Sequence, residues 1–346
     1  MKKVRLAIVG TGAIAFTHTY GIQRLDEAEL VAICDVVPSQ MEHYRKTFPM
    51  DDKDCYTDYR EILKRDDVDA VIVCASDEAH RNITVDALRA GKDVLCEKPM
   101  ALKVDECREM IKVAEEMGKR LMIGQVCRKA PGFIKAKELV EKGEIGEVFF
   151  MESEYAHDYC EIPGINNWRK VPERQPIIGG GCHAVDLMRW ILGDPSEAFA
   201  YANHKMLPGW PIDDCVVSVL KFPNDVIGKV FTSIGCKRKY TMRTVIYGSK
   251  GTIITDNTSE TISLFREVID GEKSLYGVHN QTIEMKIPVS IDSHNMTEEI
   301  RDFINCINND LPADPDGKQG FYTVAVCDAI VRSSKTGEKI TIDYTV

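Results

Sequence analysis

The run Val4-Arg5-Leu6-Ala7-Ile8-Val9-Gly10-Thr11-Gly12-Ala13-Ile14-Ala15 decides the fold of this chain. An apolar, β-rich stretch leads into a glycine turn, and helix-compatible residues follow to about residue 25. In this strand, turn and helix context, G-x-G-x-x-G/A predicts a dinucleotide site. Gly10 permits the tight turn, Gly12 lets backbone amides approach a pyrophosphate, and Ala15 lets the helix pack close to the strand.

A second strand strengthens this prediction. Residues 29–34 read as another buried strand that ends in Asp35, about 25 residues after Gly10, where the dinucleotide fold places an acidic side chain roughly 20 residues on. That carboxylate accepts hydrogen bonds from both ribose hydroxyls of adenosine and would repel a 2′-phosphate, so NAD is favoured over NADP. The alternatives are a glycine turn kept for steric reasons and a solvated aspartate at a strand end.

Composition limits the partners. The chain has 346 residues, enough for two domains, and its formal charge of -10 argues against nucleic acid and anionic membranes. No apolar run reaches the roughly 18 residues of a membrane span, and Met1-Lys2-Lys3 lacks the features of a signal peptide, so we expect a cytoplasmic protein. The 12 cysteines form no C-x-x-C pair, which is typical of reduced thiols.

The periodicity predicts an α/β fold in two parts. Over residues 1–124, predicted strands (4–9, 29–34, 70–74, 93–96, 121–124) alternate with predicted helices (13–25, 38–47, 58–64, 80–90, 104–117), which indicates a Rossmann-type, doubly wound parallel sheet. Residues 125–346 predict an α+β domain with one large, mostly antiparallel sheet. Its predicted strands are 147–155, 214–222, 226–235 and 243–247, and its helices are 132–142, 183–192, 295–309 and 318–335, the last free to pack back on the first domain.

Two loops at predicted carboxyl ends of strands carry candidate ligand-binding residues. After strand 70–74, Ser76 either contacts the cofactor or caps the next helix. After strand 93–96 comes Glu97-Lys98-Pro99. The Lys98 cation would hydrogen-bond a reacting hydroxyl and stabilise an alkoxide, with Glu97 orienting it; the alternative is an ordinary surface lysine.

His183 is the candidate base. It begins a predicted helix after Gly179-Gly180-Gly181, a run that we expect to be flexible. An imidazole titrates near neutral pH and can accept a hydroxyl proton while hydride leaves carbon, although a lone histidine is more often structural. Asp186, at i+3, either orients His183 or pairs with a neighbour such as Arg189, and we favour that structural role.

Several motifs resemble the glucose-fructose oxidoreductase, inositol dehydrogenase and MocA family over essentially the whole chain. They are Gly10–Ala15 with His18, Ala90–Pro99, Gly181–Trp190, Ile212-Asp213-Asp214, Tyr247–Gly251 and Asp328–Gly337. The resemblance implies a two-domain NAD(P)-dependent oxidoreductase on sugars, cyclitols or glycosides, a homodimer or homotetramer built through the second-domain sheet, and a cis peptide before Pro99. It also implies that Lys98 and His183 are catalytic.

The loops and the resemblance together give two sets of candidate binding residues. For the cofactor they are Gly10, Thr11, Gly12, Ala13, Ile14, Asp35, Ala75, Ser76, His80, Glu97, Lys98, Gln125, Trp168 and Arg169. For the substrate they are Lys98, Arg128, Tyr155, His157, Asp158, Lys170 and His183. Trp168 either stacks on a sugar ring or belongs to the core.

The chain departs from the family's common D-x-G-x-H pattern, because Gly179 stands where that pattern has its aspartate. Glu154, His157 or Asp158 is expected to replace this carboxylate; the alternative for each is a solvated strand end. The departure weakens any inference that the substrate is an inositol or a simple aldose.

Cys182-His183 with His157, Asp158 and Cys160 also invites interpretation as a metal site. The spacing matches no known finger and a lysine-assisted dehydrogenase needs no Lewis acid, so no metal is expected. The sequence thus predicts NAD-dependent oxidation of a ring hydroxyl, with C3 of a glucose-like unit as one candidate carbon. The alternatives are glycoside cleavage through transient oxidation and elimination, and an NAD-binding sensor without turnover.

Overall fold

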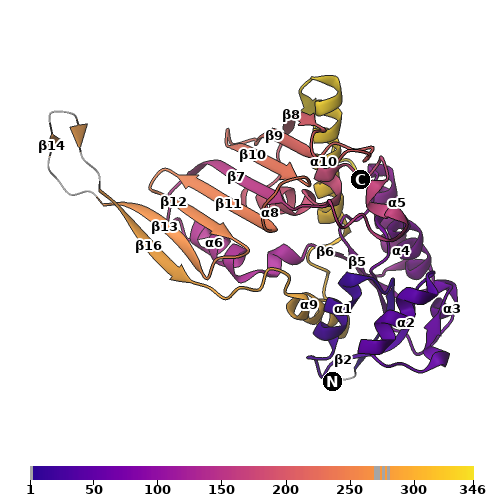
Figure 1. Cartoon of the computed structure of the whole chain (residues 1–346). Helices are drawn as coiled ribbons and strands as arrows, with labels where there is room; N and C mark the ends of the chain where they lie inside the picture. Colours follow the sequence, from indigo (N-terminus) through magenta and orange to yellow (C-terminus); the bar gives the residue numbers. More distant parts are fainter. Residues whose placement is uncertain (1–2, 269–272, 275–276, 279–280) are drawn as a thin grey trace.

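The computed structural model describes residues 3–268, 273–274, 277–278 and 281–346. Its first part, drawn in indigo and violet in Figure 1, contains a six-stranded sheet. The strand order is β3-β2-β1-β4-β5-β6, and every neighbouring pair is parallel. The strands are β1 (Val4–Val9), β2 (Ala28–Cys34), β3 (Cys55–Tyr56), β4 (Ala70–Val73), β5 (Asp93–Glu97) and β6 (Leu121–Gly124). The helices are α1 (Ala13–Ile22), α2 (Pro38–Thr47), α3 (Tyr59–Leu63), α4 (His80–Arg89) and α5 (Val104–Met117). The predicted Rossmann-type sheet is confirmed.

Burial and capping explain why this half was predictable. Every residue of β4 and β5 is buried, so these strands read as nearly continuous apolar runs. The Asp58 carboxylate accepts a hydrogen bond from the Arg60 amide at the start of α3, and Gly118, with φ +59°, ends α5 in the left-handed conformation.

The second sheet has nine strands in the order β16-β13-β12-β11-β7-β10-β9-β8-β17. They are β7 (Val148–Ala156), β8 (Glu197–Asn203), β9 (Cys215–Lys221), β10 (Ile227–Ser233), β11 (Thr241–Gly248), β12 (Gly251–Asp256), β13 (Thr261–Val268), β16 (Gln281–Pro288) and β17 (Ile340–Thr341); β14 (Lys273–Ser274) and β15 (Gly277–Val278) form a separate pair. The helices of this part are α6 (Pro131–Glu141), α7 (Pro176–Gly179) and α8 (Cys182–Leu192). The chain also forms short 3-10 turns, η1 (Asp52–Asp54), η2 (Asp77–Ala79), η3 (Val126–Lys129) and η4 (Ile165–Lys170).

The large sheet is mostly antiparallel, as predicted, but β7 and β10 pair in parallel. Alternating burial looks the same for either direction, and the chain passes through α7, α8, β8 and β9 before β10 joins β7. The sequence analysis also missed β3, β8, β12, β13, β16 and β17.

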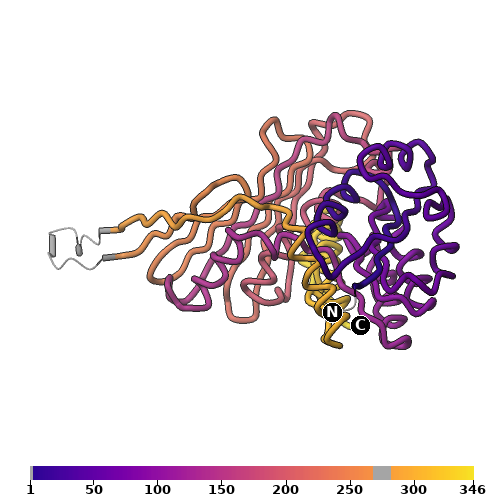
Figure 2. Tube along the Cα trace, turned by 90° about the horizontal axis from the view of Figure 1, so that it is seen from below, coloured from indigo at the N-terminus to yellow at the C-terminus, as the bar shows by residue number. Residues whose placement is uncertain are grey.

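Two late helices hold the sheets together. Asn295 and Asp316 cap α9 (Met296–Asn308) and α10 (Gly317–Thr336) by accepting hydrogen bonds from backbone amides. Helix α9 packs on α1, while α10 contacts α5 and β6 on one side and β8 on the other. Figure 2 shows both helices, in yellow, between the indigo trace of the first part and the large sheet. A domain boundary after residue 124 stays a prediction.

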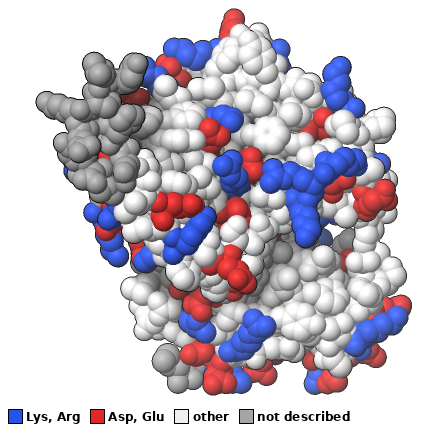
Figure 3. All heavy atoms as spheres, turned by 60° about the vertical axis from the view of Figure 1, so that its left-hand side comes forward, with Lys and Arg blue, Asp and Glu red and all other residues white. Residues whose placement is uncertain are grey.

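The surface carries charges of both signs. On the face in Figure 3, acidic and basic side chains are interspersed. Among the described residues, no helix is both long enough and apolar enough to cross a membrane. The sheet face that carries Tyr201, Val217, Val219 and Ile227 exposes these apolar side chains. That face suits the predicted homodimer or homotetramer, which stays a prediction.

A buried ion pair joins the two parts of the chain and predicts a stability effect. Arg174 Nε donates to Asp77 Oδ2 at 2.6 Å, and both side chains are almost completely buried. Asp77→Ala leaves the guanidinium buried without its carboxylate, so we expect the free energy of unfolding to fall by about 3–5 kcal/mol, measured by urea denaturation. Glu61→Ala, which removes an exposed partner of Lys64, should leave the midpoint unchanged. Equal shifts in the two variants would contradict the role of this pair.

Candidate active site

The glycine turn after β1 fits a dinucleotide. Gly10 has φ +96°, and a Cβ there would lie 2.6 Å from the Ala75 nitrogen, so the turn presses directly on the loop after β4. Gly12 is the N-cap residue of α1; a Cβ there would meet no atom within 4 Å, and no side chain caps the helix. Free amides facing open space at a helix N-terminus form an anion site, which suits a pyrophosphate.

Asp35 lies next to this turn at the carboxyl end of β2. Its Oδ2 accepts hydrogen bonds from the Thr11 amide (2.7 Å) and hydroxyl (2.9 Å), and its Oδ1 accepts one from the Val37 amide (2.8 Å). The side chain is partly exposed, and a carboxylate has about four lone-pair sites, so it retains capacity for ribose hydroxyls. Its contact with the cofactor stays a prediction.

The loop after β4 carries two of the predicted cofactor-binding residues, Ser76 and His80. Ser76 occupies the N-cap position of η2, but its hydroxyl makes no capping hydrogen bond. His80 is buried, with Nδ1 2.8 Å from the Pro99 carbonyl oxygen and Nε2 3.1 Å from that of Ala75. His80 therefore links this loop to the one that carries Lys98, and its contact with the cofactor stays a prediction.

Lys98 follows β5, and its peptide bond to Pro99 is cis, as the resemblance implied. Glu97 is buried; its Oε1 lies 2.7 Å from His18 Nε2, and its Oε2 accepts a hydrogen bond from the Lys98 amide at 3.2 Å. Glu97 thus orients Lys98 through the backbone. Burial opposes the charge on Lys98, but neighbouring groups, including the carboxylates of Glu97 and Asp77, raise its pKa above the usual value of 10.5. Lys98 is therefore an ammonium at neutral pH.

Behind Glu97 lies a polar cluster that the sequence analysis missed. In the described part of the chain, His18, Glu97 and Glu299 place one potential metal-ligand atom each within 4.8 Å of one another, all buried. Burial, and then the charge of Glu97, raises the pKa of Glu299 well above its usual value of 4.5. This set shares no residue with the metal site considered from the sequence.

His183 lies on the first turn of α8, buried, with its ring stacked on Tyr155 of β7 at 6.1 Å and 24°. Burial, and then the charges of Lys98 and His294, lowers the pKa of His183 well below its usual value of 6.5. The imidazole is therefore neutral at physiological pH and able to accept a proton. The electrostatic influence of Lys98 on this ring means that the two predicted catalytic residues lie in one neighbourhood.

Polar aromatic side chains and imidazoles surround His183. The Tyr155 hydroxyl lies 3.1 Å from His157 Nδ1 and 2.9 Å from the Tyr159 hydroxyl. The His157 ring lies 4.6 Å from that of Tyr240, and the His294 ring 6.0 Å from that of His183. Sequence analysis named Tyr155 and His157 but missed Tyr159, Tyr240 and His294. His294 could have been found by the signal used for His183, since it too stands at the start of a predicted helix.

The glycines before His183 serve close packing, so the expectation of a flexible run is wrong. A Cβ at Gly179 would overlap the Arg174 guanidinium, and one at Gly180 would lie 2.5 Å from the Tyr155 ring. Residues 179–181 are all buried. Only glycine lets Arg174 and Tyr155 come this close to the chain.

The segment with Trp168 is organised by cations on aromatic rings. The guanidinium carbons of Arg169 and Arg174 lie 4.3 and 4.8 Å from the centre of the Trp168 ring, and Lys170 Nζ lies 5.3 Å from that of Trp210. Trp168 is half-buried against these arginines. Its stacking on a sugar, like the ligand contacts of Arg169 and Lys170, stays a prediction.

Arg128 is buried in an ion pair, and its contact with a substrate stays a prediction. Its Nε and Nη2 donate to both oxygens of Asp186 at 2.8 and 2.7 Å, and Nη1 donates to Gln319. The main partner of Asp186 is therefore Arg128, and Arg189 lies 3.8 Å away. Of the two roles considered for Asp186, the structure shows the ion pair with a neighbouring arginine. Gln125 is also buried, and its Oε1 has no hydrogen-bond partner.

The carboxylates expected to replace the missing aspartate have other partners. Glu154 accepts a hydrogen bond from Arg238 at 3.2 Å, and Asp158 accepts one from Lys237 at 2.8 Å. The structure therefore brings together Lys98, Tyr155, His157 and His183 and places Asp158 beside Lys237.

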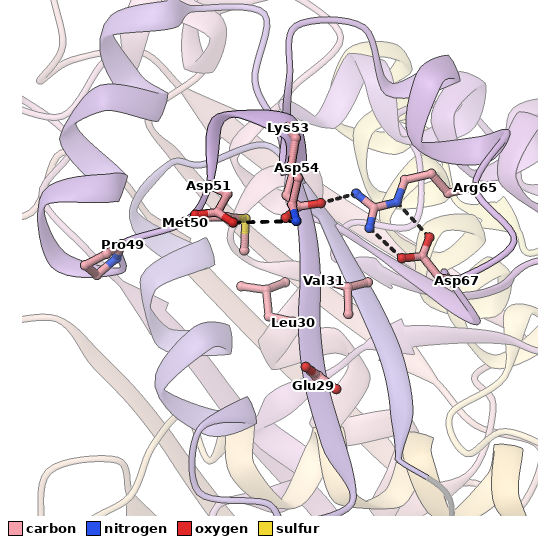
Figure 4. A pocket seen from close by; sticks show the side chains of 10 residues that line it. All are labelled: Glu29, Leu30, Val31, Pro49, Met50, Asp51, Lys53, Asp54, Arg65 and Asp67. Carbon is pink, nitrogen blue, oxygen red and sulfur yellow. Dashed lines mark hydrogen bonds and ion pairs between the residues drawn. The ribbon is translucent and has the colours of Figure 1, made fainter.

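A cavity of about 540 Å³ lies elsewhere, beside β2 (Figure 4). Its charged walls are paired internally, since Arg65 binds both Asp54 and Asp67. None of the site residues predicted from the sequence lines this cavity.

Comparison with known proteins agrees with this geometry. A family model described as "Oxidoreductase family, NAD-binding Rossmann fold" matches residues 4–125, and a second, "Oxidoreductase family, C-terminal alpha/beta domain", matches residues 137–342. Inositol 2-dehydrogenase of Salmonella typhimurium is 27% identical over 350 residues, which cover 96% of this chain and 95% of that protein.

Two solved structures share the fold. A putative myo-inositol dehydrogenase from Sinorhizobium meliloti 1021 has a TM-score of 0.82 at 23% identity, covering 99% of this chain and 100% of that one. Levoglucosan dehydrogenase in complex with NADH and L-sorbose has a TM-score of 0.86 at 19% identity, covering 99% and 100%.

The Rossmann sheet, the anion-binding turn and these matches define the chain as an oxidoreductase whose cofactor is NAD. It belongs to the glucose-fructose oxidoreductase, inositol dehydrogenase and MocA family, as the resemblance implied.

The position of Asp35 predicts cofactor selectivity. Asp35→Ala removes a charged acceptor for the ribose hydroxyls, worth about 1.5–3 kcal/mol, so we expect the Kd for NADH to rise roughly 10- to 100-fold while NADPH binding improves relative to NADH. Titration by NADH and NADPH fluorescence measures both constants. Asp26→Ala, which removes an exposed carboxylate of the same sheet region, should bind NADH as the parent does. Equal weakening of both cofactors would mean that Asp35 acts only by holding Thr11.

Proposed function

We propose that this oxidoreductase oxidises a ring hydroxyl of a sugar, a glycoside or a cyclitol to a ketone. The observation that carries the proposal is the pairing of a neutral, buried imidazole at His183 with the ammonium of Lys98. NAD, when bound, supplies the acceptor for the hydride that leaves the carbinol carbon.

Lys98 and His183 have separate roles in the proton chemistry. Lys98 donates a hydrogen bond to the hydroxyl oxygen and stabilises the negative charge that develops on it. His183 accepts the proton at Nε2, because Nδ1 faces Cys127 at 3.2 Å. Burial of His183 keeps competing water from this proton.

The walls around His183 suit a polyhydroxylated ring. Tyr155, Tyr159, Tyr240, His157 and His294 combine aromatic surfaces with hydrogen-bonding atoms, which is how proteins hold sugar rings. The names of the relatives, inositol 2-dehydrogenase and levoglucosan dehydrogenase, support a cyclitol or an anhydro sugar as the type of substrate.

Substitution of the two proposed catalytic residues tests this function. Lys98→Met and His183→Gln should each lower kcat for NADH formation by about 10²- to 10⁴-fold when free sugars, cyclitols and glycosides are assayed by absorbance, and His183→Gln should keep the NADH affinity. Lys103→Met, at an exposed position after the same loop, should retain parental kcat. No NADH from any of these substrates would count against the proposal, and aglycone release with flat NADH would indicate cleavage by elimination.

The directions in which the pKa values of His183 and Lys98 are shifted determine how kcat should depend on pH. Because the pKa of His183 lies below 6.5, its imidazole gains a proton only in acid, so kcat should stay level from neutral pH to below 6.5 and then fall. Because the pKa of Lys98 lies above 10.5, loss of the ammonium should affect kcat only above that pH. A pH profile of kcat measures both limbs. An acidic midpoint above 6.5 would be inconsistent with His183 as this base.

A further inference from the structure

In the part of the chain that the structure describes, the proposed base has no carboxylate partner. At Gly179, where the family's common pattern has its aspartate, a side chain would overlap the Arg174 guanidinium. Asp186 binds Arg128 instead. Among the described residues, the hydrogen-bond partner of the His183 ring is the thiol of Cys127, with Sγ 3.2 Å from Nδ1.

The Cys127 sulfur has a second neighbour that fixes the direction of these hydrogen bonds. Sγ lies 3.4 Å from Sδ of Met242, a thioether that has no hydrogen and can only accept. Met242 Sδ also accepts from the Tyr240 hydroxyl at 3.3 Å, which its two lone pairs allow. Met242 is satisfied as an acceptor only when the single thiol proton of Cys127 points to it, and the sulfur is then left to accept the Nδ1–H of His183.

The protonation states agree with this arrangement. Burial raises the pKa of Cys127 well above its usual value, so the group is a thiol. Lys98, Tyr155 and His294 are the other titratable groups around the His183 ring. Cys127 and His183 are both buried, so water does not compete for Nδ1.

We infer that Cys127 is a positioning residue: it holds His183 in the Nδ1–H tautomer and so presents the Nε2 lone pair to the substrate hydroxyl. The inference rests on the proposed role of His183 as base. No proton passes to Cys127; the hydroxyl proton goes to Nε2, and Nδ1–H stays bonded to sulfur throughout. A thiol thus takes over the orienting task that the common pattern gives to a carboxylate.

Four substitutions separate this role from simple packing. Cys127→Ala removes the acceptor, and kcat should fall about 10- to 100-fold, as for other groups that orient a histidine, with NADH affinity kept. Met242→Leu keeps the volume but frees the thiol to donate to Nδ1, so kcat should fall in a folded protein. Cys127→Asp supplies a charged acceptor that stabilises the imidazolium, so the acidic limb of kcat should move to higher pH. Cys107→Ala, at an equally buried cysteine of α5, should change neither kcat nor this limb.

A spectrum that needs no turnover tests the tautomer directly. In ¹H–¹⁵N spectra of protein labelled at histidine, the His183 signals, assigned by their loss in His183→Gln, should report Nδ1–H in the parent and Nε2–H in Met242→Leu. An Nε2–H tautomer in the parent would overturn the inference, as would unchanged kcat in both Cys127→Ala and Met242→Leu. If the parent shows Nδ1–H but oxidises no sugar, cyclitol or glycoside, the proposed function is contradicted. The inference about Cys127 then still holds. If Cys127→Ala does not fold, Met242→Leu and the parent spectrum decide.

Discussion

The exclusion of a second positive charge beside Lys98 is the constraint on which this site depends. In a low-dielectric neighbourhood one positive charge disfavours a second, so the Lys98 charge adds to burial in disfavouring the protonated form of His183. Burial opposes the charge on Lys98, but the neighbouring groups raise its pKa, Cys182 and Tyr159 most and then Glu97 and Asp77. Burial and then the Lys98 charge lower the pKa of His183. These opposite charge states are the ones that the proposed roles need, a donor at Lys98 and a proton acceptor at His183.

Buried polar contacts across the two sheets hold this arrangement. His18 of α1 fixes Glu97 at the end of β5, and Arg174, just before α7, binds Asp77 in the loop after β4. Helix α9 packs against α1 and brings Glu299 toward Glu97. Partnered charges of this kind are costly to break, so they specify one arrangement of the two parts of the chain.

In the proposed site, His183 keeps a partner that orients its ring, but this partner is a thiol in place of a carboxylate. With glycine at position 179, the space that a side chain would fill belongs to Arg174, whose charge has the opposite sign to an aspartate. Cys127 contacts His183 from η3, on a different segment, and does so with a neutral thiol. A weak, neutral acceptor orients the ring without raising its pKa as a carboxylate would, which fits a base that is neutral well below pH 6.5.

The sequence alone determined the parallel sheet and the glycine turn, and it predicted Asp35, Lys98 and His183 as site residues. These features depend on local patterns in the sequence. The patterns are apolar runs for buried strands, a glycine at the turn where the structure has φ +96°, and residues that directly follow a strand or begin a helix. Only the tertiary structure decided the parallel pairing of β7 with β10, because strand alternation is the same in either direction.

The tertiary structure also decided which distant side chains surround His183. Cys127, Tyr240 and His294 come from three separate segments, and nothing in their local sequence fixes the sheet register and helix packing that bring them to one imidazole. The packed glycines at 179–181 were misjudged for the same reason, since the side chains that fill the space around them, Arg174 and Tyr155, are placed by the fold.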